Sequence, residues 1–134
     1  MTKSSQIEKA EKLAVLHRGD DVLVLPNAWD VASARVLVDV GFGAIATTSG
    51  GCAFSLGYCD GEHIGRDGML DIVRCIANSV DVPVSADVEA GYGPTPEDVA
   101  ATIRGVIAAG AVGANIEDTD KLNPGNLVEF DLAV

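Results

Sequence analysis

Apolar residues recur every three or four positions in four segments of the chain, which is the spacing of amphipathic helices. Ser5 precedes the first segment and Glu8 follows three residues later, which is the arrangement of a capping box. Thr95 and Pro96 begin the last segment with a cap and a proline at the first helical position. The pattern therefore predicts helices over residues 5–18, about 31–40, about 66–80 and about 95–110.

Short, continuous apolar runs lie between these helices, and such runs are typical of strands that are buried on both faces. The predicted strands cover residues 22–26, 43–48, 82–89 and 111–118, and residues 49–62 are predicted to form a polar, glycine-containing loop. Strands that alternate with helices form a parallel sheet with right-handed crossovers. The sequence therefore predicts an α/β fold in which an N-terminal helix precedes four parallel strands with their helices.

Composition and charge narrow the class of protein. The 134-residue chain is 48% hydrophobic, which is enough to build the core of one domain. Its net charge is −11, with nine basic residues and no basic run, which argues against nucleic-acid binding through phosphate contacts. No apolar run reaches transmembrane length, and the first residues lack the apolar core of a signal peptide. We therefore expect a cytoplasmic protein that binds neither nucleic acid nor membrane.

The three cysteines also favour a reducing compartment. Cys52, Cys59 and Cys75 are odd in number and lack CxxC spacing, so we expect reduced thiols. Cys75 falls within a predicted helix and is expected in the core. Cys52 and Cys59 fall in the predicted loop, where burial as free thiols is the commoner outcome and a place near the chemistry is the alternative.

Two carboxylates end the third predicted strand, in the stretch over residues 82–93. Strand side chains alternate between faces, so Ser85, Asp87 and Glu89 are predicted to share one face. Unpaired buried carboxylates are costly, so this face needs a neutralising partner. A hard divalent cation such as Mg²⁺ is one candidate, because it prefers oxygen ligands. A solvated carboxylate pair with nearby salt-bridge partners is the alternative, and the strand by itself does not decide between them.

Polar residues gather at the C-terminal end of every predicted strand. The clusters lie at residues 27–30, 47–51, 87–89 and 117–118. In α/β sheets and barrels, this edge is where binding and catalytic sites form. Asp87, Glu89 and Glu117 come from two adjacent strands and could together bind Mg²⁺, some of them through water. Such a metal could stabilise an enolate or bind an α-oxo acid.

Two loops could complete the site. The amides of residues 49–51 could hold a carboxylate or oxyanion, because Gly50 and Gly51 let the backbone approach a ligand closely. A plain turn is the alternative there, and the local sequence alone favours it. Tyr92 lies between Gly91 and Gly93, on a segment that could act as a mobile lid.

Five motifs, taken together and in order, resemble the isocitrate lyase/phosphoenolpyruvate mutase superfamily across residues 23–118. They are Leu-Pro-Asn-Ala-Trp-Asp (25–30), Thr-Thr-Ser-Gly-Gly (47–51), Ser-Leu-Gly-Tyr-Cys-Asp (55–60), Ser-Ala-Asp-Val-Glu-Ala-Gly-Tyr-Gly (85–93) and Asn-Ile-Glu-Asp (115–118). The resemblance implies a (β/α)₈ barrel of the TIM type. It also implies Mg²⁺-dependent making or breaking of C–C or P–C bonds next to an oxo-acid carboxylate, through a metal-stabilised enolate.

The resemblance assigns the carboxylates to a metal site. Asp87 resembles a Mg²⁺ ligand of the family, and Glu89 occupies the second place, where many members carry Asp. Glu117 resembles the acidic residue of the fourth strand that holds metal-bound water. The implied cofactor is Mg²⁺, with Mn²⁺ as the alternative.

The resemblance also assigns substrate and catalytic residues for a small-molecule carboxylate. The predicted catalytic residues are Asp60, which matches the family's loop aspartate near the metal and substrate, and Tyr92, which is chosen from its place between two glycines. The predicted substrate-binding residues are Trp29, Thr48, Ser49, Gly50 and Gly51.

The loop after the fourth strand departs from the family pattern. Isocitrate and methylisocitrate lyases carry Lys-(Lys/Arg)-Cys-Gly-His there, whereas Asp118 is followed here by Thr-Asp-Lys-Leu-Asn-Pro-Gly. Lys121 is present, but no Cys, Gly or His follows in register, and the double-lysine loop of phosphonate mutases is not reproduced. An oxo-acid decarboxylase or lyase therefore fits better. His17 and His63 match no catalytic motif and are expected to be surface or structural residues.

The length of the chain is the second departure from the family pattern. A closed barrel of this type needs about 250 residues, so residues 1–134 are predicted to form a single partial domain that ends after the fourth strand. Half a barrel exposes sheet edges and apolar surface, so we expect a homo-oligomer. A non-catalytic half-barrel that keeps the metal-site motifs but is inactive, or folds only by oligomerising, is the alternative to an enzyme.

Overall fold

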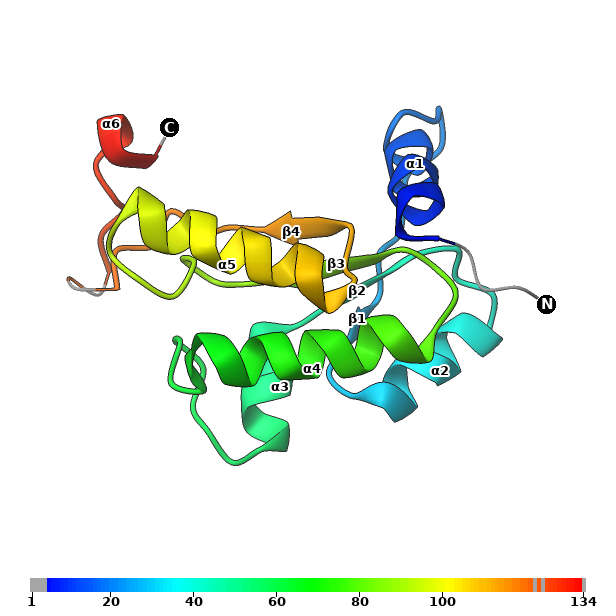
Figure 1. Cartoon of the computed structure of the whole chain (residues 1–134), viewed down its shortest axis with the longest axis horizontal. Coiled ribbons are helices and arrows are strands. Elements are labelled where there is room, and N and C mark those ends of the chain that lie inside the picture. The colour runs from blue at the N-terminus through cyan, green and yellow to red at the C-terminus, as the bar shows by residue number, and fades with distance from the viewer. Residues whose placement is uncertain (1–4, 122, 124, 134) are drawn as a thin grey trace.

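The computed structural model describes residues 5–121, 123 and 125–133 (Figure 1). The elements in chain order are α1 (Gln6–His17), β1 (Asn27–Ala28), α2 (Val31–Asp39), β2 (Ile45–Thr47), α3 (Ser49–Ser55), α4 (Gly65–Ser79), β3 (Val84–Asp87), α5 (Pro96–Ala109), β4 (Gly113–Asn115) and α6 (Phe130–Ala133). The four predicted helices are confirmed as α1, α2, α4 and α5. Their caps are also confirmed, since Ser5 and Glu8 bond reciprocally at α1 and Thr95 caps α5.

The four strands form one parallel sheet in the order β1-β2-β3-β4, as the alternation of strands and helices predicts. The register pairs Ser85 with Ala46 on one side and with Gly113 on the other. Because every strand points the same way, the four C-terminal ends meet at one edge of the sheet. The polar clusters predicted at the strand ends therefore share that edge.

The core lies between the sheet and the long helices α4 and α5, which lie side by side over the strands (Figure 1). Val84 and Ala86 of β3 and Val88, just after it, are buried in this core, together with Met69 and Val73 of α4. This confirms the predicted apolar face of the third strand.

Helix α1 lies against the end of the sheet opposite the polar edge. The Gln6 side-chain amide donates to the carbonyls of Ile107 and Ala111, and the Lys9 ammonium donates to the carbonyl of Val80. Val80 and Ala111 precede β3 and β4, so these bonds fix α1 at the N-terminal ends of the strands. The polar edge is left uncovered by α1.

Several boundary predictions were wrong. The third and fourth strands, predicted over residues 82–89 and 111–118, cover only Val84–Asp87 and Gly113–Asn115. A strand was predicted over residues 22–26, but the observed strand β1 covers only Asn27–Ala28. Val22, at the start of the predicted strand, is 90% exposed. The apolar run leads into β1 without strand pairing of its own: Val22 and Val24 are exposed, and Leu23, Leu25 and Pro26 are only partly buried. The loop predicted over residues 49–62 in fact begins with helix α3. The sequence did not predict this helix because it contains two glycines, at residues 50 and 51, and glycine has low helix propensity.

The cysteine predictions were correct only in part. Cys52 is buried, as the commoner outcome for a free thiol, but it lies in α3 and not in a loop. Cys75 is exposed, although its helix packs on the core, because it lines a surface groove beside α2 and α3. Among the described residues, the helices are too short or too polar to cross a membrane.

Candidate active site

Asp87 ends β3 and fixes the start of α3. Its Oδ2 accepts a hydrogen bond of 2.9 Å from the amide of Ser49, and its own amide donates to Thr47 Oγ1 at 2.9 Å. Ser49 is the first residue of α3, so the bond joins the end of one strand to the turn that follows its neighbour. The predicted metal carboxylate and the predicted substrate turn are therefore in direct contact.

The 49–51 turn is packed tightly on both sides. Thr48 caps α3, since its Oγ1 accepts from the Gly51 amide at 3.2 Å, so two of the three amides of this turn donate within the chain. A Cβ placed on Gly50 would lie 3.2 Å from Oδ2 of Asp60. The Asp60 carboxylate therefore lies beside the turn, and only glycine leaves it an ordinary contact distance at residue 50.

Glu89 departs from the predicted alternation. The strand ends at Asp87, and Glu89 adopts a left-handed backbone with φ of 49°, so it does not continue the face shared by Ser85 and Asp87. Glu89 is only 2% exposed. Its Oε1 accepts from the amide of Glu62 at 2.8 Å and from the hydroxyl of Tyr92 at 3.4 Å.

Lys121 neutralises Glu89. The ammonium lies 3.0 Å from Glu89 Oε2 and 3.6 Å from Glu117 Oε2. Burial lowers the pKa of Lys121, but the hydrogen bond and charge of Glu89, with Glu117 and Glu62 nearby, outweigh burial and raise the pKa overall. Sequence reasoning noted Lys121 only as a residue outside the family pattern, because its partner Glu89 lies 32 positions away along the chain.

Three residues of this edge share a strained backbone. Glu62, Glu89 and Tyr92 are the non-glycine residues with positive φ in the described part of the chain. Such conformations are uncommon and cluster at functional sites, where the surroundings hold them in place. The Tyr92 amide donates to Glu62 Oε1 at 2.8 Å, so each of the three is bonded to another. Burial, followed by the charges of Glu89 and Glu62, raises the pKa of Tyr92, so its hydroxyl stays protonated and donates.

The segment after Glu89 is tied to α4 and α5. Arg66 donates to the carbonyl of Tyr92 at 2.7 Å and to Thr102 Oγ1 at 2.8 Å. The Thr102 hydroxyl donates in turn to the carbonyl of Gly91 at 2.6 Å. The mobile lid predicted around Tyr92 stays a prediction, and these are the bonds that its opening would have to break. Sequence reasoning did not identify Arg66, Glu62 or Thr102, because they act through partners far along the chain.

We tested whether the three predicted metal carboxylates fit a divalent cation. Their oxygen donors suit Mg²⁺, and Asp87 keeps one oxygen, Oδ1, whose contact with the Glu89 amide is a long 3.4 Å. Glu89 and Glu117 are instead directed to Lys121. Within the described residues, no three Asp, Glu, His or Cys side chains are grouped to hold a metal ion. The structure thus fits a cation at Asp87 by donor type, but it does not fit the shared three-carboxylate site.

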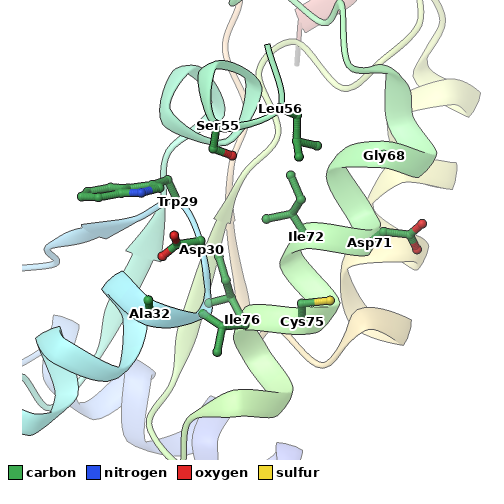
Figure 2. A pocket seen from close by; sticks show the side chains of 11 residues that line it. Trp29, Asp30, Ala32, Ser55, Leu56, Gly68, Asp71, Ile72, Cys75 and Ile76 are labelled. Carbon is green, nitrogen blue, oxygen red and sulfur yellow. The ribbon is translucent and has the colours of Figure 1, made fainter. Parts of the chain in front are cut away.

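Trp29 lies apart from the carboxylates. It lines a groove of about 540 Å³ between α2, α3 and α4, on the outer side of the helices (Figure 2). The groove is mainly apolar, with Leu56, Ile72 and Cys75 among its lining residues. The structure therefore groups Thr48, Ser49, Gly50, Gly51, Asp60 and Asp87 around one turn, and Glu89, Tyr92 and Glu117 around Lys121. The Cβ of Trp29 also lies against Gly51, so its side chain adjoins the first group while lining the groove.

Similarity to known proteins extends over most of the chain. A family model described as phosphoenolpyruvate phosphomutase matches residues 13–134. The chain is 38% identical over 104 residues to an uncharacterised protein of Mycobacterium tuberculosis, covering 78% of this chain and 39% of that protein. It is 32% identical over 114 residues to the oxaloacetate decarboxylase of Bradyrhizobium, covering 83% of this chain and 38% of that enzyme.

Solved structures extend the likeness to the fold. The crystal structure of a candidate phosphonomutase of Burkholderia cenocepacia superposes with a TM-score of 0.89 at 44% identity, covering 94% of this chain and 51% of that chain. Oxaloacetate acetylhydrolase in complex with oxalate superposes with a TM-score of 0.85 at 31% identity, covering 96% of this chain and 46% of that chain. The chain therefore has the α/β fold of a TIM-type barrel over about half of the length of these structures.

Proposed function

The chain belongs to the phosphoenolpyruvate phosphomutase family, and from this premise we propose that it carries part of a lyase or mutase site for a small oxo-acid carboxylate. The proposed reaction makes or breaks a C–C or P–C bond next to the carboxylate, through an enolate. The chain spans about half, or less, of the relatives it matches, so the activity is proposed for the site and its residues.

One observation carries the proposal. The hydrogen bond between the Ser49 amide and Asp87, with Asp60 on the other side of Gly50, brings three separate segments to one point. The family motifs assign Ser49 to substrate binding, Asp87 to the metal site and Asp60 to the loop near both. The carboxylates of Asp60 and Asp87 thus lie on either side of the 49–51 turn. A site of this kind suits a small substrate that can contact the backbone of the turn.

Charge supports a cation in this site. Asp60, Glu62, Asp87, Glu89 and Glu117 all lie at this edge, and Lys121 is directed to only two of them. An anionic substrate placed here would be repelled unless a positive charge offset this field. We propose Mg²⁺, or Mn²⁺ as the alternative, with Asp87 as the residue that binds it. A divalent cation at this position would stabilise the negative charge of an enolate oxygen.

Tyr92 is proposed to act through its protonated hydroxyl. The raised pKa keeps the proton on the oxygen at neutral pH, so the group can donate a hydrogen bond but cannot serve as a base. In this structure it donates to Glu89. Asp60 is the proposed carboxylate that contacts the substrate, since it lies beside the turn and is exposed.

The test is Mg²⁺-dependent release of pyruvate from oxaloacetate, the substrate that the names of two relatives suggest. We expect Asp87→Ala to abolish the release, because the substitution removes both the proposed cation ligand and the anchor of Ser49. Asp39→Ala, at the end of α2 and outside the site, is the matched control and should retain activity. Cation binding without turnover would favour the non-catalytic alternative.

We also propose that the chain self-associates in the cytoplasm. Within the described residues, β1 and β4 each pair on one edge only, and exposed edges promote association. Sedimentation with and without Mg²⁺ and oxalate, an enolate mimic, tests this. A dimer that both ligands tighten supports the proposal, whereas a monomer that neither ligand affects contradicts it.

A further inference from the structure

We propose that Lys121 supplies from within the chain the positive charge for Glu89 and Glu117, and so keeps a divalent cation away from these two carboxylates. The inference deepens the proposed function, because it concerns which residues of the same edge can bind a cation. It rests on the proposed function in one respect, namely that the ligand at this edge is a divalent cation.

In the Lys121 cluster (Lys121, Glu89 and Glu117), the ammonium contacts both carboxylates directly. The ammonium is 3.0 Å from Glu89 Oε2, which is hydrogen-bonding distance, and 3.6 Å from Glu117 Oε2. The Glu89 side chain is 3% exposed, so water does little to screen this pairing. The Lys121 side chain is 27% exposed and keeps one side toward solvent.

The other partners of Glu89 do not neutralise it. The amide of Glu62 and the hydroxyl of Tyr92 both donate to Oε1, and both donors are uncharged. They satisfy the hydrogen-bonding capacity of one oxygen but leave the negative charge in place. A buried carboxylate without a cation is strongly disfavoured. Lys121 fills this role in the structure, and a metal ion is the other cation that could fill it.

The segment that carries Lys121 is itself held in place. The amide of Asp120 donates to the carbonyl of Asn126, and the amide of Val128 donates to the carbonyl of Asp118. Thr119 and Leu127 form an isolated antiparallel bridge between the same two stretches. This small hairpin follows Glu117, whose amide donates to the carbonyl of Glu89 at 2.7 Å. Lys121 thus directly follows residues 117–120, whose backbone is bonded to Glu89 and to residues 126–128.

An ammonium and a divalent cation exclude one another at this position. Two positive charges a few ångströms apart repel strongly where solvent is scarce. Lys121 can leave by turning its flexible stem toward solvent, and Glu89 and Glu117 then lose their internal partner. Removing the ammonium should therefore turn two neutralised carboxylates into cation ligands beside Asp87.

The test is Mn²⁺ binding to the 134-residue chain, with free Mn²⁺ followed by electron paramagnetic resonance. We expect Lys121→Met to bind Mn²⁺ at least tenfold more tightly than the unaltered chain. Lys121→Arg keeps the charge and should bind within twofold of the unaltered chain. Lys12→Met removes a positive charge from the exposed side of α1 and controls for the change in net charge.

A second substitution locates the new affinity. Adding Glu89→Gln to Lys121→Met should return the affinity to that of the unaltered chain. Equal or weaker binding by Lys121→Met, or a gain that Lys12→Met reproduces, would overturn the inference. If Lys121→Met unfolds, recovery of its circular dichroism spectrum on addition of Mn²⁺ supports the inference, and failure to recover counts against it.

The proposed function is tested separately with Asp87→Asn in the otherwise unaltered chain. If this variant binds Mn²⁺ as the unaltered chain does, the proposed cation at Asp87 is wrong. The comparison between Lys121→Met and Lys121→Arg still decides the role of Lys121.

Discussion

Thr102 offers a quantitative test of how the segment around Tyr92 is held. Its side chain is fully buried, and its hydroxyl donates to the carbonyl of Gly91 at 2.6 Å while accepting from Arg66 Nε at 2.8 Å. Thr102→Val keeps the shape of the side chain and removes both bonds. Thr102→Ser keeps both bonds and removes one methyl group, so the two variants separate hydrogen bonding from packing.

The expected loss in the free energy of unfolding follows from the two hydrogen bonds that Thr102→Val removes. Losing the bond to the Gly91 carbonyl costs about 1 kcal/mol, and losing a bond from a charged donor costs about 1.5–3 kcal/mol. Arg66 is 28% exposed, so water can partly replace its lost acceptor and the lower figure applies. We expect Thr102→Val to lower the free energy of unfolding by about 2–3 kcal/mol. For Thr102→Ser we expect about 1 kcal/mol, from one buried methyl group.

The assay is urea unfolding of the three chains, followed by circular dichroism at constant pH. Hydrogen exchange at the Tyr92 amide adds a local readout, and it should be faster in Thr102→Val than in Thr102→Ser. Equal stability of Thr102→Val and Thr102→Ser, or a more stable valine variant, would refute the reasoning, because packing would then outweigh the two bonds.

Two further predictions concern the start of α3. A Cβ on Gly50 would lie 3.2 Å from the Asp60 carboxylate, so Gly50→Ala should displace that side chain and weaken oxalate binding about tenfold by calorimetry, with little change in stability; unchanged binding would place Asp60 outside the site. Burial raises the pKa of Cys52 to about 11, so below that pH its thiol stays protonated and should react slowly with iodoacetamide. The two exposed cysteines, Cys59 and Cys75, should be alkylated first, and mass spectrometry at pH 8 that finds Cys52 modified equally fast would contradict the burial.

Helices α1, α2, α4 and α5 follow from local sequence, whereas α3 was predicted to be part of a loop. The Ser5–Glu8 box, the start of α5 at Thr95 and its end at Gly110, with φ of 96°, all depend on residues within one or two turns of each other. Interactions of such short range are nearly independent of the rest of the fold. The parallel order of the strands follows as well, because helices between successive strands permit only crossover connections.

The position of the candidate site could also be predicted, although its internal contacts could not. Parallel strands bring their C-terminal ends together, so Asp87 and the 49–51 turn had to lie at the same edge. That the Ser49 amide would donate to Asp87 depends on the register between β2 and β3, which sequence periodicity does not determine. The same limit explains why the apolar run before β1 was mistaken for a buried strand, since burial depends on what lies beside it.

The sequence by itself determined the four longer helices, the α/β class and the edge at which the acidic residues gather, because these depend on local caps, periodicity and connection rules. Only the tertiary structure decided the charge pairing within that edge. Glu89 leaves the strand pattern through a left-handed backbone, and Lys121, 32 residues later, meets it in space. Such a pairing depends on how two distant loops fold over the sheet, and the cost of a buried unpaired charge is why we propose that it decides which carboxylates are left for a cation.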